Sequence, residues 1–340
     1  MKDLFCIILA GGVGSRFYPL SSKEEPKQFL DFFNENESLI QKTYFRISKF
    51  IKNENIFILT NKKYLKLTSK HLKKIPKKNI LCEPQKKNTA ASVAYGSFTI
   101  HKKNNNAKIL VCPSDHLIGN NIKFQNTCLK GFDFLKKNEK ILTIGIKPTT
   151  AHTGYGYIKT KKSTSNKITI VEEFKEKPDE KKAIEFFKSK NYLWNSGMFI
   201  FTSNQIINEF KIHQKKTFHQ FNKILKEKKF DVNECFLKLK NISFDYAILE
   251  KSKNISVIHA NLKWNDLGSY SSLYNEMKKS KINNATNLKE IKMINSKNNL
   301  IILPNGKKLI VKGLSNYIIA EKNNTLLIYP KEKDQEIGNL

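Results

Sequence analysis

The feature that most constrains the fold is a short apolar run that leads directly into a glycine-rich segment near the start of the chain. Residues 7–10 (Ile-Ile-Leu-Ala) are followed by residues 11–14 (Gly-Gly-Val-Gly), then by Arg16 and, further on, by Lys27. An apolar run that ends in glycines is typical of a buried parallel strand entering a phosphate-binding loop. Glycines let backbone N–H groups approach a phosphate closely, and the two cations add fixed positive charge. The segment therefore indicates nucleotide chemistry.

Two better-known phosphate-binding patterns do not fit this loop. A dinucleotide fingerprint starting at Gly12 requires a third glycine at the position of Phe17. A P-loop closes with Gly-Lys-Ser or Gly-Lys-Thr, and no such tripeptide follows. A glycine cluster alone is also compatible with a purely structural turn, but such a turn has no need of Arg16 and Lys27 after it.

Strand-like and helix-like segments alternate over the first part of the chain. The strands are expected at 5–11, 55–60, 108–115, 141–146 and 194–201. This alternation predicts an α/β fold with a Rossmann-like, mostly parallel mixed sheet, which binds its ligands beyond the carboxyl ends of the strands. Beyond about residue 280, short β-rich runs are separated by Asn-Gly, Lys-Gly and Asn-Asn turns. We therefore expect a catalytic domain over 1–280 and a small, β-helix-like C-terminal domain over 281–340.

The net charge of +31 raises the question of a polyanionic partner. The lysines are scattered from end to end, however, whereas a nucleic-acid footprint is clustered on one helix or arm. We attribute the charge to composition and expect no nucleic-acid partner. A non-catalytic polyanion-binding protein stays open as the alternative from another functional class.

Composition also bears on the compartment. The chain has no apolar stretch of about 18 residues, so we expect no membrane-spanning helix. Its five cysteines form no C-x-x-C pair and no zinc-like spacing. A cytoplasmic protein is the resulting expectation.

Two aspartates have contexts that suggest chemistry. Asp115 comes directly after an expected strand, and Asp266 lies in the segment Trp-Asn-Asp-Leu-Gly at 264–268. Either residue alone is also compatible with a turn or a helix cap. Two carboxylates from distant parts of the chain are what Mg²⁺ between triphosphate oxygens requires, so both are candidate metal ligands.

Several motifs occur in the order in which one enzyme family has them. They are AGGVGSRFYPLS (10–21), PKQFL (26–30), EPQKKNTA (83–90), PSDHLI (113–118), TGYGYI (153–158), FKEKPD (174–179), LWNSGMFIF (193–201), SFDYAILEK (243–251) and WNDLGSY (264–270). The chain thereby resembles the mannose-1-phosphate guanylyltransferases (GDP-mannose pyrophosphorylases), a bacterial sugar nucleotidyltransferase family, over essentially its whole length. The resemblance implies that GTP and α-D-mannose 1-phosphate are converted to GDP-mannose and pyrophosphate with the help of Mg²⁺.

The resemblance also implies a role for each matched position. Arg16 would neutralise the departing pyrophosphate, Lys27 would approach the α-phosphate, and Asp115 and Asp266 would ligate Mg²⁺; Arg16, Lys27 and Asp115 are the catalytic candidates. The expected nucleotide-binding residues are Leu9, Ala10, Gly11, Gly12, Gly14, Ser15, Glu83, Asn88, Thr89 and Ser114. The expected sugar-phosphate-binding residues are Gly154, Gly156, Glu176, Lys177 and Asn195.

The motifs leave one alternative activity open, and the chain departs from the family pattern at three positions. Another hexose-1-phosphate nucleotidyltransferase would share the loop and both aspartates, so it stays the alternative within the class. The chain has Ser22, Lys87 and Ala91 where most relatives have arginine, arginine and proline, and lysine cannot supply a bidentate fork. The C-terminal β region offers a surface through which two copies can pair as a homodimer.

Overall fold

The computed structural model describes residues 2–160 and 167–340, which form two compact units. Unit 1 comprises Met1–Gly11, Tyr44–Ser114 and Ile118–Trp264, and unit 2 comprises Gly12–Thr43, Asp115–Leu117 and Asn265–Leu340. Each unit is thus assembled from segments that are far apart in the sequence. The predicted domain boundary between residues 280 and 281 stays a prediction.

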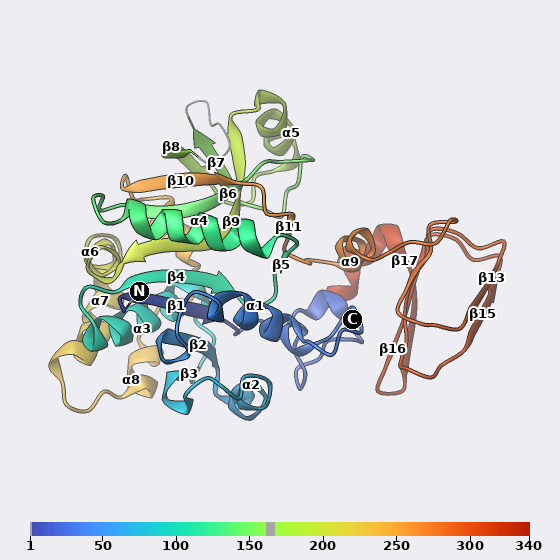
Figure 1. Ribbon diagram of the computed structural model, residues 1–340, viewed down its shortest axis with the longest axis horizontal. Coiled ribbons are helices and arrows are strands. Elements are labelled where there is room, and N and C mark those ends of the chain that lie inside the picture. The colour runs from blue at the N-terminus through green and yellow to red at the C-terminus, as the bar shows by residue number, and fades with distance from the viewer. Residues whose placement is uncertain (1, 161–166) are drawn as a thin grey trace. The chain divides into compact units, whose positions relative to one another are not determined.

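Unit 1 is built on one nine-stranded sheet with the order β3-β2-β1-β4-β9-β6-β10-β8-β7 (Figure 1). Its strands are β1 (Leu4–Leu9), β2 (Ile56–Asn61), β3 (Ile80–Glu83), β4 (Lys108–Pro113), β6 (Ile141–Ile146), β7 (Tyr157–Thr160), β8 (Ile168–Lys175), β9 (Tyr192–Thr202) and β10 (Ile255–Ala260). Strands β3, β2, β1 and β4 are parallel, as are β6 and β10, whereas β9 runs antiparallel to β4 and β6. The predicted α/β class with a mixed sheet is confirmed.

Burial explains why the central strands were recognisable in the sequence. Strands β1, β4 and β6 are buried along most or all of their length, so they are continuous apolar runs rather than alternating ones. Strand β8 has exposed and half-buried residues at most positions, and its sequence ITIVEEFK carries two glutamates.

Helices cover both faces of this sheet. They are α1 (Leu39–Ser48), α2 (Leu65–His71), α3 (Asn88–Lys103), α4 (Asn121–Phe134), α5 (Glu180–Ser189), α6 (Ser203–His213), α7 (Lys215–Lys226) and α8 (Val232–Leu237), with the π-helical turn η6 (Asp245–Leu249) and the short 3₁₀ turns η3 (Asn53–Asn55), η4 (Lys62–Tyr64) and η5 (Lys77–Asn79). Figure 1 shows α4 drawn across the front of the sheet. Gly131 of α4 lies directly against the side chains of Leu142 and Ile200, which identifies the face that this helix covers.

Unit 2 joins the glycine-rich loop to the C-terminal β region. Its elements are η1 (Ser15–Phe17), η2 (Lys27–Phe29), α9 (Tyr270–Glu276), β12 (Ala285–Thr286), β13 (Ile291–Ile294), β14 (Leu300–Ile302), β15 (Leu309–Lys312), β16 (Tyr317–Lys322), β17 (Thr325–Pro330) and η7 (Lys331–Asn339); β5 (Leu117–Ile118) and β11 (Trp264–Asn265) lie where the chain passes between units. Phe17 packs on Tyr270 with ring centroids 5.1 Å apart, and the Tyr270 hydroxyl donates to the Phe17 carbonyl at 3.1 Å. The loop therefore shares its apolar core with the C-terminal strands.

The C-terminal strands form a coil of parallel turns. Leu300 pairs with Ile318 in one sheet, and Ile291 pairs with Leu309 in a second sheet, so that partners lie 18 residues apart in the sequence. Strand β17 closes the first sheet antiparallel to β16. The predicted small C-terminal β domain is thereby confirmed, whereas its β-helix-like character stays a prediction.

A buried asparagine ties successive turns of the coil together. The Asn299 side chain is fully buried; its Nδ2 donates to Asn284 Oδ1 at 3.1 Å and to the Leu314 carbonyl at 2.8 Å. Its Oδ1 accepts the N–H of Tyr317 at 2.9 Å. Asn299 thus satisfies backbone groups that the turns between strands leave unpaired.

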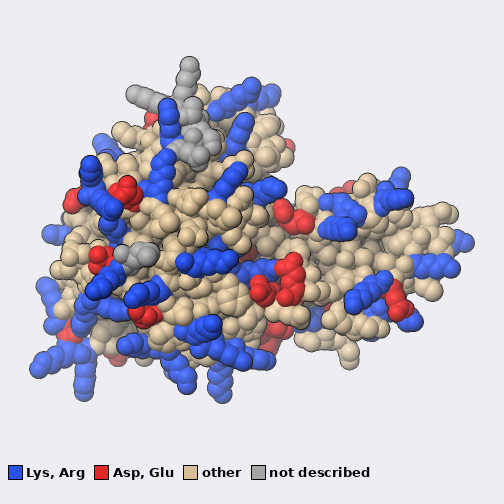
Figure 2. Space-filling view, in the orientation of Figure 1, with Lys and Arg blue, Asp and Glu red and all other residues tan. Residues whose placement is uncertain are grey.

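The surface charge follows the composition. Figure 2 shows Lys and Arg side chains spread over the whole visible face rather than gathered in one patch. The five cysteines are all unpaired. Among the described residues, none of the helices combines the length and the apolar character needed to span a bilayer.

Replacing Asn299 with alanine is expected to lower the free energy of unfolding by about 2–3 kcal/mol, because it removes a fully buried amide together with its hydrogen bonds to the part-buried Leu314 carbonyl and Tyr317 N–H. Urea denaturation measures the change. The exposed amide of Asn305 in the same unit is the matched control, and Asn305→Ala should change stability by no more than about 0.5 kcal/mol. Equal effects of the two substitutions would contradict a structural role of the Asn299 network.

Candidate active site

Gly14 and Lys27 are packed against each other in unit 2. Gly14 precedes η1 with a φ of 75°, in the left-handed region that favours glycine. A Cβ at Gly14 would collide with the Cβ of Lys27, while the Lys27 N–H donates to the Val13 carbonyl at 3.0 Å. The loop therefore requires glycine at this position for two reasons, and it is fixed to the segment that carries Lys27.

The Lys27 ammonium brings three distant segments of unit 2 together. Its side chain is buried, with Nζ donating to Asp115 Oδ2 at 2.9 Å and to the backbone carbonyl of Asp266 at 2.8 Å. Burial alone would raise the pKa of the Asp115 carboxyl, but the charges of Lys27 and His116, together with hydrogen bonds from Lys27 and the backbone, outweigh burial and lower that pKa. Asp115 is therefore held as a carboxylate. Three of the predicted residues are in contact here.

Arg16 and the Asp266 side chain both form hydrogen bonds with the backbone of Gly268. Asp266 Oδ1 accepts the N–H of Gly268 at 3.1 Å, and Arg16 Nη1 donates to the Gly268 carbonyl at 3.5 Å. Arg16 is exposed, so its remaining donors are accessible to a ligand from solvent. Gly12 and Ser15, also predicted to bind nucleotide, are exposed in the same loop.

The donor set of unit 2 has the chemistry that Mg²⁺ requires. Within residues 2–160 and 167–340, no group of three or more His, Cys, Asp or Glu side chains is arranged to hold a metal ion. Mg²⁺ is usually bound by one or two carboxylates, with water and substrate phosphates as its other ligands. Asp115 and Asp266 both have atoms within hydrogen-bonding distance of Lys27 Nζ. The contact of Asp115 is made by its carboxylate and that of Asp266 by its backbone carbonyl, while the Asp266 carboxylate accepts the Gly268 N–H. Two aspartates in one cluster suit a site that substrate phosphates complete.

Ser22, which departs from the family pattern, and its neighbour Glu25 form local bonds in unit 2. Ser22 Oγ accepts the N–H groups of Glu24 and Glu25 at 3.1 Å each, which closes a tight turn. The Glu25 carboxylate pairs with Lys322 at 2.7 Å. Ser22 thus has a structural partner where relatives have arginine.

Glu83 in unit 1 is a buried carboxyl group beside the end of β1. Its Oε1 accepts a short hydrogen bond from the Ser92 hydroxyl of α3, and a Cβ at Gly11 would lie 3.3 Å from Oε2. Burial raises the pKa of Glu83 to about 7, although the hydrogen bond from Ser92 opposes this effect. The acid and Gly11, predicted together as nucleotide-binding residues, are brought together.

Other predicted nucleotide-binding residues form hydrogen bonds at the strand ends of unit 1. The Ser114 N–H donates to the Leu9 carbonyl, and Thr60 Oγ1 donates to the Ala10 carbonyl, both at 3.0 Å. Their backbone groups therefore fix the ends of β1 and β4.

Asn88 and Thr89 form the first turn of α3. Asn88 Oδ1 accepts the Thr89 N–H at 2.9 Å, and Thr89 Oγ1 accepts the Phe244 N–H at 2.8 Å. Both side chains thus have structural partners in the absence of a ligand, and their predicted contact with guanine stays a prediction.

Three predicted sugar-site residues form a cluster in unit 1. The Asn195 N–H donates to the Gly156 carbonyl at 2.8 Å, and a Cβ at Gly156 would lie 2.5 Å from Glu176 Oε2. Lys177 is exposed, with its Nζ 3.8 Å from Glu176 Oε1, and Gly154 is also exposed. The close approach at Gly156 requires the absence of a side chain.

Asp245, Glu250 and Thr143 belong to this cluster and were not predicted as site residues. Asn195 Nδ2 donates to Asp245 Oδ1 at 2.9 Å, while Asn195 Oδ1 accepts from Thr143 Oγ1 at 3.0 Å. Glu250 Oε1 accepts the Glu176 N–H at 3.1 Å. Both acids lie in SFDYAILEK (243–251), a motif that carried the resemblance but received no role. Acidic residues in a matched motif were the signal that could have identified them.

The pKa values of Glu176 and Asp245 are raised in this cluster. Burial raises the pKa of Glu176 to about 7, and the charges of Asp245 and Glu250 add to this effect while Lys177 opposes it. Burial also raises the pKa of Asp245. Near neutral pH the cluster therefore holds at least one proton for a substantial fraction of the time, and it offers hydrogen-bond donors as well as acceptors.

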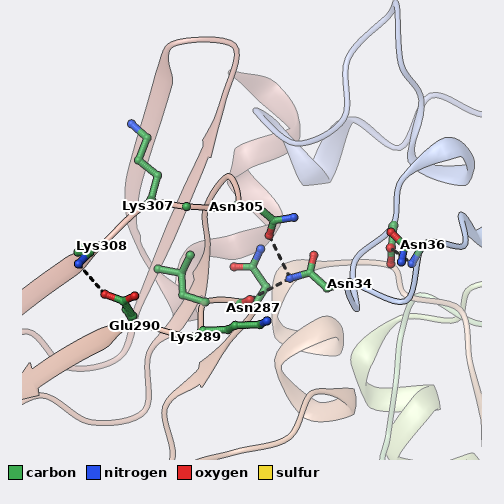
Figure 3. A pocket seen from close by; sticks show the side chains of 11 residues that line it. Asn34, Asn36, Asn287, Lys289, Glu290, Asn305, Lys307 and Lys308 are labelled. Carbon is green, nitrogen blue, oxygen red and sulfur yellow. Dashed lines mark hydrogen bonds and ion pairs between the residues drawn. The ribbon is translucent and has the colours of Figure 1, made fainter.

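A polar cavity of about 660 Å³ in unit 2 lies apart from all the predicted residues. Figure 3 shows Asn34 reaching Asn287 and Asn305, and Lys308 paired with Glu290. Most of its lining side chains are exposed and engaged with one another. It is therefore a weaker candidate for the reaction than the Lys27 and Asn195 clusters.

Comparisons with known proteins identify the family of the chain. The family profile described as "Nucleotidyl transferase" matches residues 5–282. Mannose-1-phosphate guanylyltransferase RfbM of Salmonella typhimurium (strain LT2) is 33% identical, covering 98% of this chain and 71% of that protein. Alginate biosynthesis protein AlgA of Pseudomonas fluorescens is 33% identical over 98% of this chain and 70% of that protein.

A solved structure from Thermus thermophilus, described as a mannose-1-phosphate geranyltransferase, superposes with a TM-score of 0.91. It is 23% identical, and the match covers 99% of this chain and 98% of that one. This likeness supports the fold.

The Glu83 carboxyl predicts a pH dependence of stability. Because its pKa in the folded state is about 7, above its ordinary value of 4.5, its contribution to stability falls as the pH rises from about 4.5 to about 7. Glu83→Gln removes this titration, so the variant does not lose this contribution to stability as the pH rises. The difference in unfolding free energy, variant minus parent, should therefore increase by up to about 3 kcal/mol between pH 4.5 and pH 7. Urea denaturation at several pH values measures it, with the exposed Glu139→Gln as control. Parallel pH profiles of the parent and Glu83→Gln would contradict the assignment.

Proposed function

Because the chain belongs to the nucleotidyl transferase family, among the mannose-1-phosphate guanylyltransferases, we propose that it converts GTP and α-D-mannose 1-phosphate to GDP-mannose and pyrophosphate. The observation that carries this proposal is the cluster in which Lys27 contacts Asp115 and Asp266 behind a glycine loop. A buried cation between residues that both offer oxygen ligands suits a reaction that gathers negative charge on phosphates.

The reaction requires positioning more than proton transfer. A phosphate oxygen of the sugar phosphate attacks the α-phosphorus of GTP in line, and the bond from that phosphorus to the bridging oxygen of pyrophosphate breaks. The attacking oxygen is already negatively charged, so no general base is needed. This accounts for a site made of a loop, cations and carboxylates.

The residues of unit 2 have complementary tasks in this proposal. The backbone of the loop at Gly12, Gly14 and Ser15 holds the triphosphate, and Arg16 neutralises the departing pyrophosphate. Lys27 neutralises charge that develops at the α-phosphate. Mg²⁺ bound by Asp115 and Asp266 would supply further positive charge between the phosphate oxygens.

Unit 1 provides the residues that select the substrates. The carboxylate of Glu83 can accept hydrogen bonds from the N1–H and the exocyclic amine of guanine, with Leu9, Ala10, Gly11, Asn88, Thr89 and Ser114 as its predicted neighbours in nucleotide binding. Glu176 and Asn195 bind sugar hydroxyls, Gly154 and Gly156 allow close approach, and Lys177 binds the sugar phosphate.

Asp245 is added to the sugar-binding residues. Asn195 Oδ1 accepts from Thr143 Oγ1 and from the Gly197 N–H at 3.2 Å, while one proton of its amide goes to Asp245. These bonds fix the orientation of the amide and leave one N–H for a ligand. A fixed donor beside two acids is suited to distinguishing hexoses by the direction of a hydroxyl.

The setting of the reaction follows from the same proposal. Free cysteines throughout the chain suit a reducing compartment, so we place the enzyme in the cytoplasm. Scattered lysines favour catalysis over the polyanion-binding alternative, and pairing of two copies through the C-terminal β region stays a prediction.

Replacement of the metal-binding carboxylates tests the reaction. With GTP, mannose 1-phosphate and Mg²⁺, the parent should form GDP-mannose and pyrophosphate in equal amounts. Asp115→Asn and Asp266→Asn should each lower kcat by about 10²–10³-fold, because charge neutralisation is lost. Chelation of Mg²⁺ should abolish turnover, and the exposed Asp133→Asn should behave as the parent.

Two outcomes would separate the parts of this proposal. Product with another hexose 1-phosphate but none with mannose 1-phosphate would refute the sugar assignment. Unchanged turnover in both aspartate variants would refute the metal assignment.

The sugar cluster predicts a selective effect on one substrate. Asp245→Ala and Asn195→Ala should each raise the KM for mannose 1-phosphate by about 10- to 100-fold, because a fixed donor is lost or misplaced. The KM for GTP should stay within about twofold of the parent value. Steady-state kinetics measures both, with exposed Glu172→Gln as control. An equal rise in both KM values would indicate a general loss of structure instead.

A further inference from the structure

The turn that carries Gly154 is folded around the side chain of His152. The Gly154 N–H donates to His152 Nδ1 at 3.0 Å. A Cβ at Gly154 would lie 2.8 Å from His152 Cε1 and 3.1 Å from Nδ1. The imidazole therefore occupies the space that a side chain at Gly154 would need, and it satisfies the N–H of that residue. His152 directly precedes the matched motif TGYGYI (153–158) and has no role in the reaction proposed above.

Tyr157 closes the same turn from the sheet. Its side chain is fully buried, and its hydroxyl donates to the His152 carbonyl at 3.0 Å. Tyr157 belongs to β7, where it pairs with Trp194 of β9. The turn is thus held at two points, by the Tyr157 hydroxyl at its start and by the imidazole at Gly154.

Aromatic contacts connect the imidazole to the strand that carries Asn195. The imidazole stacks on the Tyr155 ring, with centroids 4.0 Å apart and planes inclined by 13°. The Tyr155 ring contacts Trp194 edge to face at 5.0 Å. Trp194 directly precedes Asn195, whose N–H donates to the Gly156 carbonyl at 2.8 Å. A displacement of the imidazole therefore reaches the Asn195 cluster by two routes, the Tyr155 side chain and the backbone of Gly156.

The bond at Gly154 requires a neutral imidazole. Nδ1 can accept the Gly154 N–H only while it carries no proton, because both ring nitrogens of an imidazolium are donors. On protonation, two donors would face each other and the bond would be lost. Histidine side chains ordinarily titrate at about pH 6.5, so this change falls within the range of an enzyme assay.

Other titratable and charged groups lie around this turn. The ring contacts of His152 include Tyr155 and Trp194, and of these only the phenol titrates, ordinarily at about pH 10. The Asn195 cluster contributes Glu176, Lys177, Asp245 and Glu250, and the surface beside Trp194 carries Lys147, His259 and Lys263. All of them are retained in a variant of His152, so a comparison with the parent at the same pH isolates the imidazole.

We propose that His152 is a positioning residue for the sugar phosphate. Its neutral imidazole fixes the turn at Gly154 and, through Tyr155 and Gly156, holds the Asn195 cluster in the conformation that binds mannose 1-phosphate. This inference rests on the proposed function and adds to it a residue that acts through others. It also explains the glycine at position 154, because His152 fills the space beside it.

Two substitutions separate the acceptor from the ring. His152→Phe keeps a ring on Tyr155 but removes the acceptor, so the KM for mannose 1-phosphate at pH 8 should rise by about tenfold, while the KM for GTP stays within about twofold of the parent. His152→Asn supplies an amide oxygen near the position of Nδ1, so its KM for mannose 1-phosphate at pH 8 should lie within about twofold of the parent. His219→Phe, at an exposed histidine elsewhere in unit 1, should behave as the parent.

The pH profile tests the protonation step. Between pH 8 and pH 5.5, the ratio of the KM for mannose 1-phosphate in the parent to that in His152→Asn should rise by about threefold or more, because the imidazole loses its acceptor and the amide does not. The substrate phosphate and Glu176 also titrate in this range, but they do so in both proteins and cancel in the ratio.

The outcomes distinguish this inference from the function on which it rests. An active parent with an unchanged KM for mannose 1-phosphate in His152→Phe, or an unchanged ratio across the pH range, would overturn the role of His152 alone. An equal rise in both KM values of His152→Phe would also overturn it and indicate a general loss of structure, which circular dichroism detects. No GDP-mannose from the parent would refute the proposed function and this inference with it.

Discussion

The buried ammonium of Lys27 is the interaction on which the arrangement of unit 2 depends. Its two hydrogen bonds reach Asp115, 88 residues away, and the Asp266 carbonyl, 239 residues away. A buried cation is costly unless it is paired, so each of these segments is held in place by the others. The stem of Lys27 also excludes a side chain at Gly14. Loop conformation, carboxylate position and charge are therefore set by one side chain.

The carboxyl groups of the two units differ in charge for a simple reason. Asp115 has a lysine in direct contact, and its pKa is lowered in spite of burial. Glu83 is buried and Glu176 is half-buried, each with no cation in comparable contact, and their pKa values are raised to about 7. A permanently charged carboxylate suits a metal ion, whereas a carboxyl that titrates near neutral pH suits hydrogen bonding with a base or a sugar.

The sequence was sufficient to predict the elements that have a local pattern. It was insufficient to predict the roles of residues that depend on contacts between distant segments. Continuous apolar runs predicted the strands β1, β4 and β6. The glycine loop followed by Lys27 predicted a phosphate-binding segment. The pairing of Lys27 with Asp115 depends on the fold of unit 2 and has no local signal. The position of Asp245 in a matched motif was a signal, but its contact with Asn195, which gives the residue its role, depends on the fold and is not visible in the sequence. The integration of the loop with the C-terminal coil through Tyr270 likewise depends on a contact between residues 253 positions apart.

Parallel strands of the C-terminal coil are paired at a spacing of 18 residues between β13 and β15 and between β14 and β16, and at 15 residues between β12 and β14. Each turn thus brings the next strand into register with the one before it, and buried side chains such as Asn299 bond across successive turns. A relative can therefore gain or lose one whole turn without disturbing the register of the others, whereas a change of any other length has to be absorbed in a loop. The length of this region is thus free to vary in steps during evolution, while the glycine loop packed at its base is not.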